Sequence, residues 1–208
     1  MRVALFGTSA DPPHLGHQSI LIWLAQTFDQ VAVWAAENPY KPKQSPLSDR
    51  AQMLRLMIEA LPPNLASGKV SVYQHLSDRY SVYSIMRARQ YWPEAKFSLV
   101  VGADLIAQLP KWYQAQAIFE QVEILVFPRP GYTIDGPALS ALQQVANVAI
   151  AHPQDQYDVA SSRYRQNKCS AVPHDLPPVI RDYINERDLY PCLQTPSAHP
   201  QTQLSAHR

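Results

Sequence analysis

The chain has 208 residues, a length that fits one domain with a sizeable core and leaves little room for a second domain. Its 18 Lys and Arg against 17 Asp and Glu give a net charge of +1, which excludes a chain-wide basic field for duplex DNA or an anionic membrane. No apolar run approaches a membrane span, and Cys169 and Cys192 have no metal-ligand spacing. We therefore expect a cytoplasmic protein without nucleic-acid or membrane partners.

Apolar runs alternate with helical patterns along the chain. Residues 18–28 and 48–61 carry apolar side chains at helical spacing, with Ser48 as the predicted N-cap of the second helix. The predicted strands are 2–6, 31–36, 69–73, 97–101, 122–127 and 147–151. This alternation predicts an α/β fold, a Rossmann-like open parallel sheet with helices on both faces. The domain is expected to span residues 1–190, and the polar, proline-dotted segment 191–208 is predicted to be a mobile tail.

The first loop, within FGTSADPPHLGHQSI (6–20), follows the first predicted strand. Ligands of open parallel sheets bind where strands end and helices begin. The loop matches neither the dinucleotide pattern nor the P-loop. If they open the next helix, His14 and His17 lie one turn apart, and Gly16 lets a ligand approach the backbone. Two imidazoles there suit a triphosphate, whose charge favours their protonated form.

Two other interpretations of the histidine pair remain open. The spacing alone also fits two unrelated histidines on the surface or in the core. A zinc site would need further ligands, and the candidates are His152, Cys169 and His174, all distant in sequence. The sequence around the histidine pair is therefore needed to choose between these interpretations.

GTSADPPHLGH resembles the signature of the HxGH nucleotidylyltransferases, and later segments resemble the bacterial nicotinate-nucleotide adenylyltransferases. The family's first loop is similar to G-G-[ST]-F-D-P-x-H-x-G-H, with Thr8 here replacing the second glycine and Ala10 the phenylalanine. Tyr40 and Ala160 are two further departures. The resemblance covers roughly residues 2–190. Its other segments are NPYKPKQSPLSDRAQM (38–53), RYSVYSIMRARQYWP (79–93), VVGADLIAQLPKW (100–112), FPRPGY (127–132), VASSRYR (159–165) and VIRDYINERDLY (179–190).

The resemblance implies a nucleotidylyltransferase-type fold and transfer of the adenylyl group of ATP to nicotinate mononucleotide, giving deamido-NAD and pyrophosphate. Mg²⁺ would be carried with the ATP. The implied catalytic residues are His14, His17 and Lys41. The implied ATP-binding residues are Gly7, Thr8, Ser9, His14, Gly16, His17, Gly102, Asp104, Ser161, Ser162 and Arg165. The implied mononucleotide-binding residues are Lys41, Tyr80, Ser81 and Trp112.

Several of these residues also have purely structural interpretations. Trp112 can cap the core, Asp104 can be a helix N-cap, and Lys41 can be a solvated charge. Arg129 is interpreted as a turn residue, and Arg163 is placed outside the site.

The function also has alternatives. The same chemistry on nicotinamide mononucleotide or phosphopantetheine is one, and a non-catalytic nucleotide sensor with this fold, suggested by the four departures, is another. The sequence does not fix the oligomeric state, and a homo-oligomer is possible.

Overall fold

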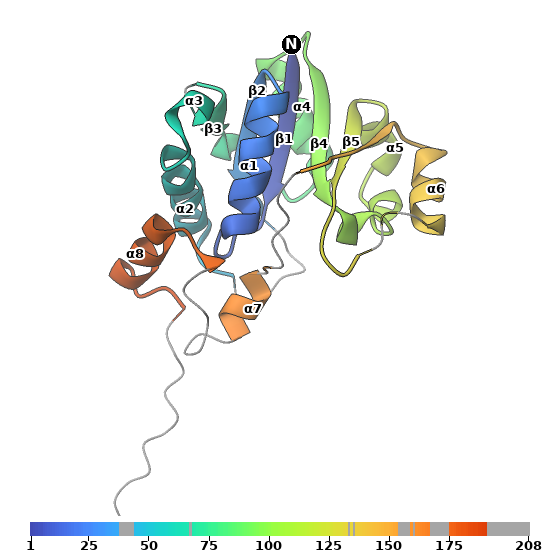
Figure 1. Cartoon of the computed structure of the whole chain (residues 1–208). Coiled ribbons are helices and arrows are strands. Elements are labelled where there is room, and N and C mark those ends of the chain that lie inside the picture. Colours follow the sequence, from blue (N-terminus) through green and yellow to red (C-terminus); the bar gives the residue numbers. More distant parts are fainter. Residues whose placement is uncertain are drawn as a thin grey trace, which may run out of the picture.

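A computed structural model describes residues 1–37, 44–66, 68–132, 134, 136–153, 159, 161–166 and 175–190. Within these residues six parallel strands form one sheet in the order β3-β2-β1-β4-β5-β6 (Figure 1). The strands are β1 (Arg2–Thr8), β2 (Gln30–Ala35), β3 (Val70–Val72), β4 (Lys96–Gly102), β5 (Val122–Phe127) and β6 (Val148–Ile150). All six predicted strands are confirmed, close to their predicted bounds. The predicted tail lies outside the described residues.

Helices connect most of these strands. The α-helices are α1 (Leu15–Thr27), α2 (Leu47–Glu59), α3 (Pro63–Ala66), α4 (Ser81–Tyr91), α5 (Ala115–Phe119), α6 (Pro137–Gln143), α7 (Ser161–Gln166) and α8 (Pro178–Glu186). The 3₁₀ turns are η1 (Gln74–Leu76), η2 (Ala103–Leu105) and η3 (Leu109–Lys111). Across the described residues, no helix has the length and apolar character needed to cross a membrane.

The predicted N-cap of α2 was wrong. The N-cap is Pro46, and Ser48 is already inside the helix. Leu47 packs against the core, and this tertiary contact places it in the first helical position. The predicted N-cap thus lies two residues too late, a difference that is common at helix ends.

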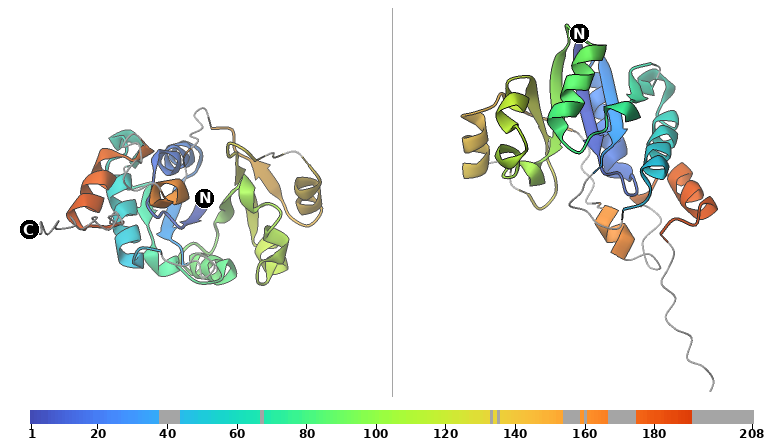
Figure 2. Two further views of the ribbon diagram at one scale, coloured as in Figure 1. Left: turned by 90° about the horizontal axis from the view of Figure 1, so that it is seen from below. Right: turned by 180° about the vertical axis from the view of Figure 1, so that it is seen from behind.

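Helices cover both faces of the sheet, as predicted (Figure 2). Along β1, Ala4 and Phe6 point into one core and Val3 and Leu5 into the other, because successive side chains of a strand alternate between faces. The first core is completed by α1, α2 and α8, and the second by α4, α5 and α6. Burial on both faces explains why the strands are continuous apolar runs in the sequence.

The strand order reverses between β1 and β4. Pairing of β1 with β2 continues to Thr8 and Ala35, whereas pairing of β1 with β4 ends at Leu5 and Leu99. The carboxyl ends of β1 and β4 are therefore not paired with each other. In open α/β sheets this switch point is where ligands bind. Figure 1 shows α7 beyond the same end of the sheet.

Candidate active site

His14 and His17 lie at the start of α1, as the sequence predicted. His14 is the N-cap, and its backbone N–H donates to Nδ1 of His17 at 3.2 Å. The two ring centroids are 3.9 Å apart. The first turn of α1 carries no acidic residue. The partial positive charge of this helix end is therefore not offset locally, and the site suits an anion.

The hydrogen bonds of His17 define its tautomer. Because Nδ1 accepts from the backbone, the ring proton resides on Nε2. Nε2 lies 3.1 Å from the hydroxyl oxygen of Thr8 and donates to it. Thr8, which departs from the family's glycine, thus helps to orient the His17 ring.

His14 is partly buried, and its pKa is shifted. Burial and the charge of Arg129 lower its pKa to about 4, so the ring is neutral at pH 7 in the ligand-free chain. The protonated form was expected only beside a bound polyphosphate, so that expectation stays a prediction. Among the described residues, Nδ1 of His14 is buried without a hydrogen-bond partner. Such an atom marks a place where a ligand or water is expected.

Gly16 keeps the space beside the His14 ring open. A Cβ at this position would lie 3.1 Å from ring atoms of His14 and from Cγ2 of Val159. Any side chain would therefore press on the ring.

Two more glycines make room for neighbouring side chains. A Cβ on Gly7 would lie 2.7 Å from the indole ring of Trp34, and a Cβ on Gly102 would lie 2.4 Å from Oδ1 of Asp104. A side chain on Gly7 would thus displace the indole, whereas the Asp104 carboxylate is the end of a side chain that can rotate away from Gly102. In this structure the Asp104 carboxylate folds back over Gly102.

Asp104 pairs with Arg129, a residue that sequence reasoning left in a turn. Nη1 of Arg129 lies 3.0 Å from Oδ2 of Asp104, and its charge also reaches His14. Arg129 does lie at a turn, in which its carbonyl oxygen accepts from the backbone N–H of Tyr132 at 3.0 Å, and its side chain in addition pairs with Asp104. The N-cap interpretation of Asp104 was wrong, since Gly102 is the N-cap of η2.

The side chains of α7 reach the first loop. The hydroxyl of Ser161 donates to the carbonyl oxygen of Pro12 at 2.8 Å. Arg165 donates to the carbonyl oxygen of Asp11, and its Nη1 lies 3.7 Å from Oδ2 of the Asp11 carboxylate. Ser162 is exposed. The structure thus places Ser161 and Arg165 against the loop that carries the histidines.

Arg50 fixes the backbone around this loop and was missed from the sequence. It is 3% exposed and donates to the carbonyl oxygens of Ser9, Ala36 and Ser45 at 2.9, 2.8 and 3.0 Å. The sequence did contain a signal for this role. Arg50 lies on the same face of the predicted helix as Leu54, where an apolar residue is expected.

The predicted mononucleotide residues lie at the start of α4 and after η3. Tyr80 is the N-cap of α4, and Ser81 is its first residue. The Tyr80 ring lies 4.5 Å from that of Tyr113, the neighbour of Trp112. Trp112 packs against the second core and stays partly exposed, so its structural interpretation is supported.

Some predicted residues lie outside the described residues. They are Lys41, Tyr40, Ala160, Cys169, His174 and Cys192. In the parts of the chain that the structure describes, no three His, Cys, Asp or Glu side chains gather as metal ligands.

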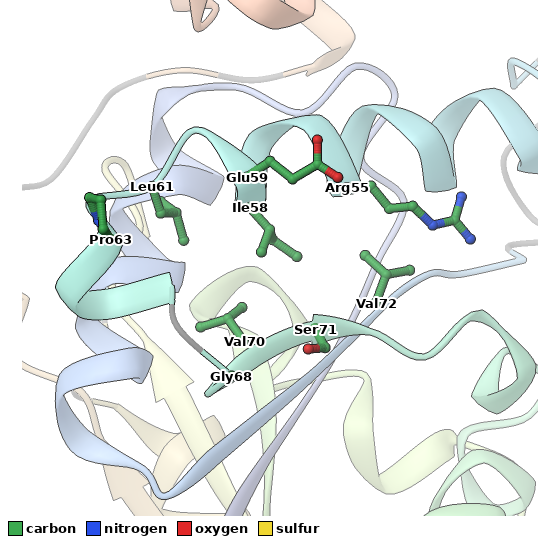
Figure 3. Close-up of a pocket in the computed structure, with 9 residues that line it drawn as sticks. All are labelled: Arg55, Ile58, Glu59, Leu61, Pro63, Gly68, Val70, Ser71 and Val72. Atoms are coloured by element: carbon green, nitrogen blue, oxygen red, sulfur yellow. The ribbon is translucent and has the colours of Figure 1, made fainter.

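A pocket of about 590 Å³ lies elsewhere, between α2, α3 and the edge strand β3 (Figure 3). It is lined by Arg55, Ile58, Glu59, Leu61, Pro63, Gly68, Val70, Ser71 and Val72. None of these is a predicted site residue. We assign this pocket no role in the chemistry.

Comparison with known proteins agrees with this geometry. The family model of cytidylyltransferase-like proteins matches residues 5–167. The chain is 43% identical over 203 residues to a probable nicotinate-nucleotide adenylyltransferase of Synechocystis sp., covering 91% of this chain and 99% of that protein. A probable nicotinate-nucleotide adenylyltransferase of Bacillus cytotoxicus is 27% identical over 195 residues, covering 91% and 98%.

Solved structures show the same fold. The nicotinic acid mononucleotide adenylyltransferase of Plasmodium falciparum, solved with NaAD, is 16% identical with a TM-score of 0.78, covering 91% of this chain and 97% of that one. The same enzyme solved with APC gives a TM-score of 0.76. The chain therefore belongs to the cytidylyltransferase-like family, and within it to the nicotinate-nucleotide adenylyltransferases.

Proposed function

We propose that the chain transfers the adenylyl group of ATP to nicotinate mononucleotide, giving deamido-NAD and pyrophosphate. The observation that carries the proposal is the histidine pair in the first turn of α1, at the switch point of the sheet, on a loop that Arg165 contacts through Asp11. The names of the relatives support the same reaction. We place the reaction in the cytoplasm, where ATP is supplied.

The chemistry asks for positioning and charge neutralisation. An oxygen of the mononucleotide's 5′-phosphate attacks the α-phosphorus of ATP, and the bond from that phosphorus to the bridging oxygen of pyrophosphate breaks. No general base is required, because the attacking phosphate is already ionised at neutral pH. The Nε2 proton of His17, which the Thr8 hydroxyl accepts in the ligand-free chain, would be shared with a phosphate oxygen, and backbone N–H groups at the start of α1 would donate to the phosphates.

The remaining charged residues have complementary roles in this proposal. Arg165 and Arg129 would neutralise the phosphate charge that builds up as pyrophosphate leaves. The Asp104 carboxylate would accept hydrogen bonds from ribose hydroxyls, as the family resemblance implies. Lys41 is retained as a further cation on the same grounds.

We further propose that Mg²⁺ arrives with ATP. Mg²⁺ keeps several waters and is commonly held by substrate phosphates with few protein ligands. The described residues fit this, since Arg129 brings positive charge to His14 and the Asp11 carboxylate is already paired with Arg165. Bound Mg²⁺ would supply neutralisation of the phosphate oxygens.

The mononucleotide would bind beside Tyr80 and Trp112. Trp112 is partly exposed, so its indole can stack on the pyridine ring. Ser81 opens α4, an eleven-residue helix without an acidic residue in its first turn. Its backbone N–H groups would therefore favour the carboxylate of nicotinate over the neutral amide.

The direct test is product identification. We expect pure protein with ATP, Mg²⁺ and nicotinate mononucleotide to form deamido-NAD, identified by mass, and to prefer this acceptor to nicotinamide mononucleotide and phosphopantetheine. Absence of acceptor-dependent pyrophosphate release would contradict the proposal and favour a nucleotide sensor.

The role of His17 is tested with His17→Asn. Oδ1 of asparagine occupies the place of Nδ1 and can still accept from the backbone of His14, whereas the group equivalent to Nε2 is lost. We expect kcat to fall by about 10²-fold or more with an unchanged melting temperature. Turnover near the wild-type rate would remove His17 from the mechanism.

A further inference from the structure

The carboxylate of Asp11 joins four separate segments of the chain. Its side chain is 0% exposed. Oδ1 accepts from the Tyr190 hydroxyl at 2.5 Å and from the Ser45 backbone N–H at 3.3 Å, while Oδ2 lies 3.7 Å from Nη1 of Arg165. A buried carboxylate persists only when its partners are held in place. Asp11 therefore couples the positions of the first loop, the start of α2, α7 and the segment after α8.

Tyr190 is held in a strained backbone conformation to make this contact. Its φ is +56°, a left-handed value that residues other than glycine rarely adopt. Burial and the hydrogen bond to Asp11 raise the pKa of the Tyr190 hydroxyl, so it remains a donor at physiological pH. Strain that the surrounding contacts maintain is a reason to look for a functional role.

Tyr190 also contacts α7 directly. Its ring packs edge-on against the ring of Tyr164, with centroids 5.8 Å apart. Tyr164 precedes Arg165, which donates to the Asp11 backbone carbonyl. Tyr190 thus donates to Asp11 through its hydroxyl and packs with its ring against Tyr164, the residue before Arg165.

We propose that Tyr190 is a positioning residue for ATP binding: its hydroxyl holds the Asp11 carboxylate so that Arg165 is presented to the triphosphate. A guanidinium has five N–H donors, more than Asp11 uses, so an anchored Arg165 can still donate to phosphate. This inference rests on the proposed function, in which Arg165 binds the phosphates. Nothing in the sequence pattern of the first loop points to a residue 179 positions away.

The test is Tyr190→Phe, which removes only the hydroxyl. We expect the Kd for Mg-ATP, measured by calorimetry without acceptor, to rise about fivefold. The KM for nicotinate mononucleotide should stay within about twofold of the wild-type value, because the substitution changes only the part of the site that is proposed to bind the ATP phosphates. An unchanged Kd for Mg-ATP would overturn the inference.

The chain offers a matched control in Tyr183→Phe. Tyr183, on α8, donates to the Asp49 carboxylate at 2.8 Å, a similar bond to a buried carboxylate in α2. We expect this variant to lose comparable thermal stability and to keep the wild-type affinity for Mg-ATP. An equal loss of affinity in both variants would reduce Tyr190 to a general stabilising role and overturn the inference.

A double-mutant cycle separates positioning from structure. In an Arg165→Ala background, Tyr190→Phe should leave the Kd for Mg-ATP unchanged, because the residue that it positions is gone. A further fivefold loss there would contradict the inference. A wild-type chain that binds Mg-ATP but forms no deamido-NAD would contradict the proposed function alone.

Discussion

His17 is oriented before any ligand binds, because its two ring nitrogens have different partners. The backbone N–H of His14 fixes Nδ1, and the Thr8 hydroxyl accepts from Nε2. A ring held in this way needs little reorganisation when phosphate oxygens approach Nε2. Thr8, where the family has glycine, therefore supplies an acceptor that orients the Nε2–H group of His17.

The contribution of Thr8 is tested with Thr8→Val. Valine keeps the shape and the strand preference of threonine but cannot accept from His17. Loss of one orienting hydrogen bond of about 1 kcal/mol should lower kcat by roughly fivefold. Steady-state pyrophosphate release measures the effect, and Thr8→Ser, which keeps the hydroxyl, should stay near the wild-type rate. Equal rates for the valine and serine variants would refute the orienting role.

At the scale of elements, α2 is tied to the ends of β1 and β2 by one side chain. Arg50 projects from the first turn of α2 and donates to carbonyl oxygens that follow both strands, at Ser9 and Ala36. The planar guanidinium carries several N–H donors that point in different directions and can reach three separate carbonyl oxygens. The compact ammonium group of lysine cannot reproduce this arrangement. The link holds the loop before the histidines in place.

Arg50→Lys should therefore destabilise the fold. A single ammonium cannot satisfy three separated carbonyls, and at least one would be left buried without a donor. We expect the free energy of unfolding to fall by about 2 kcal/mol in urea denaturation. Arg55→Lys, an exposed change on the same helix, should have no measurable effect. Equal stability of the two variants would contradict the structural role of Arg50.

These elements show why parts of the fold could be predicted from the sequence. Each of the six strands is a mostly apolar run that can be recognised from neighbouring residues alone. The histidine pair could be found for the same reason, because its two members are only three residues apart. Arg129 and Arg50 could not be assigned in this way, because they meet Asp104 and Ser9 across 25 and 41 residues. Only the packed sheet brings such partners together.

At the scale of the whole molecule, the sheet order concentrates the candidate site residues at one edge. The pairing of β1 and β4 ends at Leu5 and Leu99, so the loops that leave these strands face each other across the switch point. His14 follows β1, and Arg129 follows β5. The charge of Arg129 reaches His14 because both lie at this edge. Because His14 is partly buried at this edge with a lowered pKa, its protonation lowers the free energy of unfolding of the whole chain.

That link predicts how stability depends on pH. The pKa of His14 is about 4 in the folded chain and about 6.5 when unfolded, so the unfolded state binds the proton first. Stability is thus complete above the unfolded pKa and decreases as pH falls from about 6.5 toward 4. At pH 5 the loss due to His14 should be about 2 kcal/mol relative to pH 7.

The measurement compares urea unfolding of the wild type and His14→Asn at pH 7 and pH 5. All other titrating groups are common to both proteins, so the difference between their losses isolates His14. We expect the wild type to lose about 2 kcal/mol more than the variant. Arg129→Gln should shrink this excess, because removing the nearby positive charge raises the pKa of His14. Identical losses in the wild type and His14→Asn would mean that His14 is protonated as readily in the folded chain as in the unfolded one.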